Sequence, residues 1–253
     1  DLVAETSSNY SIGFVYSDSY NSNWIEALTL SADWYDLTID DAIQGQDPGN
    51  VLDACAETLD PVACGNIDRS ASGAVGLVNN RLVNIGRIEA SGLDFGLNYF
   101  APLTGIGQFD IRVNATYLDN YTEITNNADG SQTVNDLTGT ITDQTFQRAF
   151  PEWRANTRFG WTLEQWNAGI TFRYIDSVVQ PSGDILSSRT FTDARLSYAF
   201  RPDGDGFTIA IGANNIFDKD PATCLNTCGS INMSPVLHDL PGTFGYLRVT
   251  YRH

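Results

Sequence analysis

The sequence predicts an all-β chain whose antiparallel strands form part of a transmembrane β-barrel. Three observations indicate this fold class. Polar and apolar residues alternate with a period of two over most of the chain, aromatic residues lie near the ends of the alternating runs, and short connections alternate with long ones. Alternation by itself also fits a soluble sandwich, so the other two observations decide between them.

The alternation is clearest in the segment QFDIRVNATY, residues 108–117. Phe109, Ile111 and Val113 share one face with the odd-numbered residues that follow, while the even-numbered residues are polar. Similar runs cover residues 91–99, 154–163, 166–174 and 193–200. No window of comparable length has a convincing helical stripe, so we expect strands as the regular structure throughout.

Along the chain these runs predict about nine strands. The strands are expected at residues 5–16, 25–43, 79–101, 107–124, 150–163, 166–178, 189–201, 207–217 and 241–253. The first begins at a loop end and the last finishes at a turn end. Because bacterial single-chain barrels have an even number of strands, this odd count predicts that residues 1–253 are the C-terminal portion of a larger barrel.

The connections differ in length between the two ends of the predicted strands. Short ones fall at 17–24, 102–106, 164–165 and 202–206, and long ones at about 44–78, 125–149, 179–188 and 218–240. Short periplasmic turns and long extracellular loops are typical of an outer-membrane barrel. The short segment PDGDG, residues 202–206, has Asp-Gly turn chemistry. It also matches part of a calcium loop, but the later Glu is missing, so we expect a tight turn.

Aromatic residues lie near the ends of the predicted strands. They include Tyr99, Phe100, Tyr117, Tyr121, Trp161, Trp166 and Phe200. These positions fit the aromatic girdles of a membrane barrel. The opposite faces mix Arg, Asp, Asn and Gly, as a water-filled lumen requires. In a soluble sandwich the same aromatic residues would form the core. The sequence pattern leaves this alternative fold open.

Charge and hydropathy exclude some classes of protein. The chain has 31 acidic and 14 basic residues and a formal net charge of −17, which argues against a nucleic-acid partner. No apolar run approaches the roughly 18 residues of a transmembrane helix, and residues 1–10 do not form a signal peptide. The mean hydropathy of −0.20 fits both a soluble protein and a barrel with one polar face. The absent initiator Met predicts a piece of a longer chain.

Four cysteines occur as two close pairs, Cys55 with Cys64 and Cys224 with Cys228. Three pairings are formally open, and closeness in sequence favours the two local disulfides. The rival interpretation is a metal site, but CAETLDPVAC and CLNTC lack neighbouring histidine ligands. Disulfides predict an oxidising compartment.

No catalytic constellation is found, so no enzyme activity, cofactor or metal site is predicted. The two histidines are His238, in a predicted loop, and His253, at the end of the sequence. The segment SASGAVG, residues 70–76, superficially matches a nucleophile turn, but it lacks the strand-to-helix setting that such a turn requires.

Five arginines are predicted to face the lumen: Arg112, Arg154, Arg158, Arg173 and Arg195. They are candidates for contact with an anionic substrate. The alternative, which we favour from sequence, is that they pair with Asp94, Asp110 and Asp193 along the wall or hold a plug.

Several segments, taken in order, resemble TonB-dependent outer-membrane receptors. The segment LVAETSSNYSIG resembles the family's L-x-P-E-T-S-x-N-Y-x-x-G, with Ala4 in place of proline. NIGRIEASGLDFG is similar to N-x-G-x-x-E-x-x-G-[VL]-[ED], LTLSADWYDLTIDDAI to D-Y-Y-x-I-x-I-x-D-x-I, and FPEWRAN to P-E-W-K-x-N. NNIFDKDP, residues 214–221, resembles the N-L-F-D-K ending of the penultimate strand, where Asn214 and Asn215 would finish a membrane strand.

The resemblance implies a plugged barrel of 22 strands in the outer membrane. It implies import of a scarce nutrient, such as a ferric siderophore, cobalamin or an oligosaccharide, with energy from the inner-membrane TonB complex. The implied partners are outer-membrane lipid, the barrel-assembly machinery, a small nutrient ligand and TonB, the last through a plug expected upstream. A departure is His253, where the family usually ends in an aromatic residue. The alternatives are a passive porin, or a barrel that anchors an adhesin or a surface enzyme.

Overall fold

The structure is a computed structural model. It describes residues 2–22, 24–45, 48–79, 81–84, 86–103, 105–126, 131–142, 147–200, 205–225, 227–228, 232–238 and 242–252. The expectations for His253 and for most of the PDGDG segment lie outside these residues.

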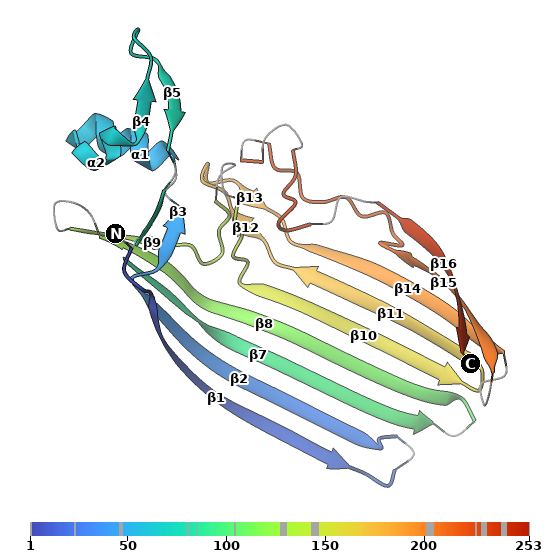
Figure 1. The fold of residues 1–253 in the computed structure, drawn as a ribbon. Coiled ribbons are helices and arrows are strands. Elements are labelled where there is room, and N and C mark those ends of the chain that lie inside the picture. The colour runs from blue at the N-terminus through green and yellow to red at the C-terminus, as the bar shows by residue number, and fades with distance from the viewer. Residues whose placement is uncertain are drawn as a thin grey trace. The chain divides into compact units, whose positions relative to one another are not determined.

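Nine long strands form the main antiparallel sheet (Figure 1). They are β1 (Thr6–Ser19), β2 (Ala27–Asp40), β7 (Gly86–Leu103), β8 (Gly107–Asn126), β10 (Trp153–Leu163), β11 (Trp166–Ile175), β14 (Arg189–Phe200), β15 (Gly206–Asn214) and β16 (Phe244–Arg252). Each pairs with the next in chain order, and β9 (Gln132–Asp136) adds to β8. The period-two alternation therefore predicted the fold class and the long strands correctly.

Short turns and long loops alternate as the sequence predicts. The turn between β10 and β11 consists of Glu164 and Gln165. Glu164 has a φ of 49°, the left-handed conformation that a tight hairpin turn requires. By contrast, the segments after β2, β8, β11 and β15 are long, and those after β2, β8 and β11 contain small elements of their own.

The segment after β2 corrects the expectation that regular structure is all strand. It contains α1 (Pro48–Thr58) and α2 (Pro61–Gly65). Proline at the start of each helix has a φ suited to the first turn, and Asp60 Oδ1 accepts a hydrogen bond from the Val62 N–H at 3.0 Å. Both helices are too short to present a long apolar stripe, and packing around a disulfide holds them instead.

Further short strands accompany these helices. β4 (Ile67–Arg69) pairs with β5 (Val75–Val78), and β3 (Ile43–Gly45) pairs with β6 (Leu82–Asn84). The predicted strand 79–101 is therefore wrong at its start, since β6 is separate and β7 begins at Gly86. The predicted strand 25–43 is likewise too long, because β2 ends at Asp40. The SASGAVG segment forms most of the β4–β5 hairpin, which excludes a nucleophile turn.

The chain divides into two compact units. One comprises residues 1–10, 36–91 and 120–137, and the other comprises residues 11–35, 92–119 and 138–253. The first contains the helices and a small core of Val51, Cys55, Ala63 and Ile67. The second contains β10 to β16 and the two-stranded β12 (Val178–Val179) and β13 (Ile185–Leu186).

Candidate functional site

The strand register separates two faces of the sheet in the second unit. Arg158 of β10 lies opposite Arg112 of β8 and Thr171 of β11, while Phe159 lies opposite Ile111 and Ile170. Across β14, β15 and β16 the same parity continues, since Ile211 lies between Leu196 and Leu247. Neighbouring side chains of one parity share a face, so one face is polar and the other is apolar.

The apolar face is exposed on the isolated chain. Ile211 is 55% exposed, Leu247 69% and Val249 60%, although all three are central to their strands. In a soluble sandwich such side chains would be packed against a second sheet. An apolar surface of this extent indicates that another apolar phase or partner covers it.

Aromatic side chains on this face gather near both ends of the strands. Near the short turns, Tyr198 lies with its ring centroid 4.8 Å from that of Trp166 and 4.7 Å from that of Phe200. Toward the long loops, the Tyr117 and Trp153 centroids are 4.8 Å apart. The predicted clustering of aromatic residues near strand ends is present.

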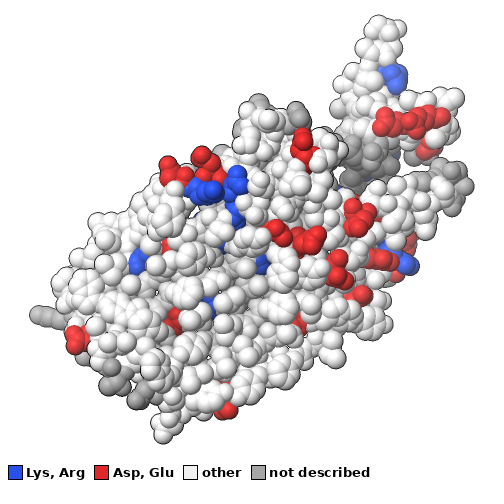
Figure 2. Space-filling view, turned by 180° about the vertical axis from the view of Figure 1, so that it is seen from behind, with Lys and Arg blue, Asp and Glu red and all other residues white. Residues whose placement is uncertain are grey.

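The polar face carries mostly positive charge. In the paired lengths of β8, β10, β11, β14, β15 and β16 its charged residues are Arg112, Arg154, Arg158, Arg173, Arg189, Arg195, Arg248 and Arg252 against Asp110 and Asp193. All five arginines predicted from sequence lie on this face. Figure 2 shows few charged side chains over the strands and more toward one end of the sheet. The polar face is thus opposite in sign to the whole chain, whose net charge is −17.

Two of the five arginines are paired with an aspartate. Arg173 Nε lies 2.9 Å from Asp193 Oδ2, and Arg112 Nε lies 3.7 Å from Asp110 Oδ2. Asp94, the third predicted partner, instead accepts a hydrogen bond from the Thr116 hydroxyl at 2.6 Å. Pairing with the predicted aspartates therefore accounts for only two of the five arginines.

Arg154, Arg158 and Arg195 form no ion pair to any described residue. Arg158 and Arg195 line a polar hollow of about 310 Å³. Neutral polar residues complete much of its lining: Asn167, Thr171, Asn214 and Tyr246. The hollow joins strands β10 to β16, and the sequence pattern did not predict it.

Glycines on the polar face leave space for larger side chains of the neighbouring strands. Gly169 lies opposite Arg195, and a Cβ placed on it would lie 3.8 Å from Arg158 Nε. Gly212 lies opposite both Arg195 and Tyr246, and the Tyr246 ring fills the space where a Cβ would stand. Glycine inside a strand commonly marks such a close approach, so the isolated glycines of these strands were the signal available in the sequence.

The NNIFDKDP segment forms a hydrogen-bonded corner at the end of β15. Asn215 has a φ of 49°, its Nδ2 donates to the Lys219 carbonyl at 2.9 Å, and its Oδ1 accepts from the Lys219 N–H at 2.8 Å. The Asn215 N–H donates to Asp193 Oδ1 at 2.9 Å. Asp218 Oδ1 accepts from the Thr243 N–H at 2.9 Å, joining the corner to the start of β16. β15 ends at Asn214, in line with the strand end that the resemblance implies, whereas the predicted strand 207–217 extends too far.

The loops of the second unit pack into a core of their own. Ile141, Val178, Leu186, Ala222 and Leu237 are all buried and pack with the disulfide Cys224–Cys228. His238, also buried, packs against the ring of Phe191, with 5.7 Å between the ring centroids. The described residues of these long segments therefore pack together at the loop end of the strands.

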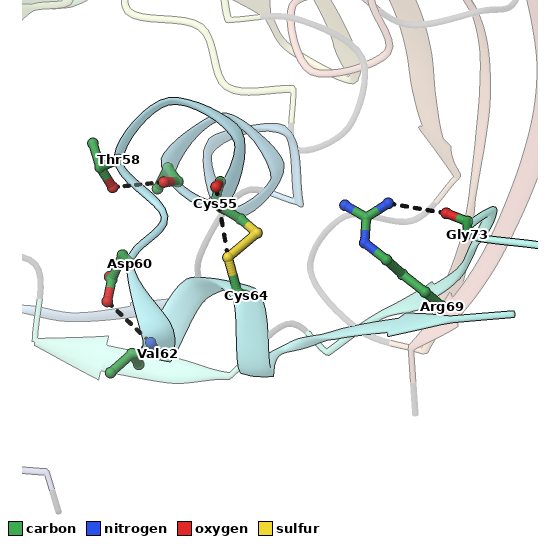
Figure 3. Close-up of a disulfide and its surroundings, with 8 residues drawn as sticks. Cys55, Thr58, Asp60, Val62, Cys64, Arg69 and Gly73 are labelled. Atoms are coloured by element: carbon green, nitrogen blue, oxygen red, sulfur yellow. Dashed lines mark hydrogen bonds between the residues drawn. A yellow bond between two sulfur atoms is a disulfide. The ribbon is translucent and has the colours of Figure 1, made fainter. Parts of the chain in front are cut away.

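The other disulfide, Cys55–Cys64, joins α1 to α2 (Figure 3). In the adjoining hairpin, Arg69 Nη1 donates to the Gly73 carbonyl at 3.1 Å. Both predicted local disulfides are thus present, and the metal alternative for these cysteines is excluded. Among the described residues, no helix is long and apolar enough to cross a membrane.

The comparisons with known proteins agree with this geometry. The family described as "TonB dependent receptor-like, beta-barrel" matches residues 1–216. The chain therefore belongs to the TonB-dependent receptor family, whose members are receptors and transporters. No curated protein matches the chain significantly.

Solved structures show the same fold. A mutant of the ferric enterobactin receptor PfeA from Pseudomonas aeruginosa is similar with a TM-score of 0.57 and 17% identity. The copper transporter OprC has a TM-score of 0.51 and 15% identity, and the FrpB iron transporter from Neisseria meningitidis has 0.50 and 15%. Each match covers 98% of this chain and 31% of the other chain, so this chain spans about a third of their length.

Proposed function

We propose that the chain is the C-terminal part of the barrel of an outer-membrane receptor that imports a scarce nutrient with energy from TonB. The observation that supports this most directly is the two-faced sheet of a chain that belongs to the TonB-dependent receptor family. Its exposed apolar face suits membrane lipid, and its polar face suits a water-filled lumen that the five predicted arginines face.

The remaining partners follow from the same proposal. The barrel-assembly machinery inserts the strands, and TonB acts through a plug domain outside residues 1–253. The small ligand belongs to the nutrients expected for the family: a ferric siderophore, cobalamin or an oligosaccharide. Two of the similar structures are named as receptors or transporters for iron, so iron chelates are the first to test.

Growth under nutrient limitation tests the proposal. The full-length receptor is expressed in a bacterium that lacks its own importers, with and without TonB, and supplied with a panel of iron chelates, cobalamin or oligosaccharides. We expect rescue by one nutrient, and only when TonB is present. Rescue without TonB would support a passive porin, and the absence of uptake for the whole panel, with the receptor at the surface, would support an anchor for an adhesin or enzyme.

A further inference from the structure

We propose that Arg158 and Arg195 form an oxyanion-binding subsite over Gly169, on the inner wall of the barrel. The proposal rests on the proposed function, because it takes the polar face as the lumen. The ligand chemistry is a carboxylate or phosphate group of a small molecule. Arg158 and Arg195 lie on β10 and β14, the two strands that flank Gly169 of β11.

The strand register brings them together. Arg195 of β14 lies directly opposite Gly169 of β11, and the guanidinium of Arg158 lies close enough that a Cβ on Gly169 would stand 3.8 Å from Nε and 3.9 Å from Nη2. Arg195 also lies opposite Gly212 on its other side. Gly169 leaves room for the Arg158 guanidinium beside the position opposite Arg195. On the other side of Arg195, the Tyr246 ring lies over Gly212.

The aspartate of the hollow, Asp193, is already engaged. Asp193 lines the same hollow, but its Oδ2 binds Arg173 Nε at 2.9 Å, and its Oδ1 accepts from Arg173 Nη2 at 3.3 Å and from the Asn215 N–H at 2.9 Å. It forms no ion pair to Arg158 or Arg195 in the described part of the chain. Two positive charges therefore line one hollow without a counter-ion from the described residues.

The hollow has the groups that an oxyanion requires. Guanidinium N–H groups bind carboxylate and phosphate oxygens in paired, charge-assisted hydrogen bonds. Neutral groups from Asn167, Thr171 and Tyr246 stand around them and suit the other polar atoms of a ligand. The volume of about 310 Å³ fits a small anion or one anionic group of a larger ligand.

Arg154 provides a matched control. It lies on the same strand and face as Arg158, carries the same charge and has no ion pair among the described residues, but it is not part of the hollow's lining. Removing Arg154 therefore takes the same positive charge from the polar face as removing Arg158. A difference in binding between these two variants then reports on the hollow and not on the general loss of charge.

The experiment is calorimetric titration of inorganic pyrophosphate into the purified full-length receptor in detergent. We expect Arg158→Gln and Arg195→Gln each to weaken binding about tenfold, the loss of one charge-assisted contact, and Arg154→Gln to weaken it by less than about twofold. Equal weakening by all three variants, or no binding by the unaltered receptor, would overturn the subsite.

A second pair of variants tests the same site without removing an arginine. Gly169→Asp places a carboxylate beside the Arg158 guanidinium, at the position opposite Arg195, where a Cβ would make only ordinary van der Waals contacts, and we expect it to abolish pyrophosphate binding. Gly169→Asn, of the same shape but neutral, is expected to keep it. Equal binding by both overturns the proposal. These titrations need no TonB, so the subsite and energised import are tested separately.

Discussion

Arg173 and Asp193 are joined diagonally across two strands, with Arg173 Nε 2.9 Å from Asp193 Oδ2. In the register Arg173 faces Phe191, and Asp193 faces Thr171, so the ion pair spans neighbouring rungs of the ladder. Because Asp193 also accepts the Asn215 N–H, this pair links the wall of the sheet to the corner that ends β15.

The first prediction concerns this pair. Asp193→Asn removes the carboxylate charge that Arg173 binds at a partly buried position, and we expect the full-length receptor to lose about 1–3 kcal/mol of unfolding free energy. Urea unfolding in lipid vesicles measures the loss. Arg112→Gln is the control, because its partner is 3.7 Å away and Arg112 is more exposed, and its effect should stay below about 1 kcal/mol. Equal effects would contradict the linking role of Asp193.

The second prediction tests which face meets lipid. Val113 lies on the apolar face opposite Thr157, and Asn114 lies on the polar face opposite Asn156. Val113→Arg should destabilise the receptor in bilayers by about 2–4 kcal/mol near the midplane, while Asn114→Arg should be tolerated. Folding stability of both variants is measured in vesicles and, in parallel, in plain buffer. Equal penalties, or native folding without lipid, would falsify the membrane assignment.

The third prediction separates two properties of Asn215. Asn215→Ala removes both hydrogen bonds to Lys219 and places a Cβ-bearing residue with no local hydrogen bonds at a φ of 49°, which should destabilise by about 1–3 kcal/mol. Asn215→Gly loses the same bonds but tolerates this φ, so its loss should be smaller by about 1 kcal/mol. Thermal unfolding of both variants decides, and a larger loss with glycine would exclude a contribution from backbone strain.

The fourth prediction compares the two disulfides. Cys224 is 0% exposed and Cys228 7%, inside the core of the loops, whereas Cys64 is only half-buried. A mild phosphine reductant should therefore open Cys55–Cys64 first and leave Cys224–Cys228 intact until the loops unfold. Alkylation and peptide mapping over time measure the order. Simultaneous opening in the folded receptor would argue against an ordered loop core.

The fifth prediction concerns residues 1–253 expressed alone. Among the described residues, β1 and β16 each have one edge without a partner strand in the main sheet, and open edges are not stable in lipid. We expect the isolated segment neither to insert stably nor to transport. The test is migration on a gel before and after heating, with the full-length receptor as control. A folded, heat-sensitive band from the segment alone would contradict this expectation.

Period-two alternation carries most of the information about the sheet. Val113 and Asn114 are assigned to opposite faces by parity alone, and the register bears this out. Ion pairs are harder to predict from the alternation, because the diagonal contact between Arg173 and Asp193 depends on how β11 and β14 align. That alignment is set by the whole set of pairings, which no single segment encodes.

The helices after β2 were missed for a related reason. α1 is only three turns long, and its buried residues Val51 and Cys55 are four positions apart. One such pair is too short a pattern to distinguish a helix from a loop in the sequence. The Cys55–Cys64 disulfide supplies the stabilisation that the helix propensity of these residues does not. The proposed subsite at Gly169 was not predicted from the sequence, because the role of a glycine depends on which side chains of the neighbouring strands lie over it.

The tip of the β4–β5 hairpin offers a place for labelling. Gly73 has a φ of 84°, and a Cβ on it would meet no atom within 4 Å, while the hydrogen bond from Arg69 closes the turn around it. An epitope tag or a fluorophore attached between Ser70 and Gly73 would leave the strands of the main sheet unchanged. The same hairpin that excluded a nucleophile turn is thus a suitable handle for following the receptor in living cells.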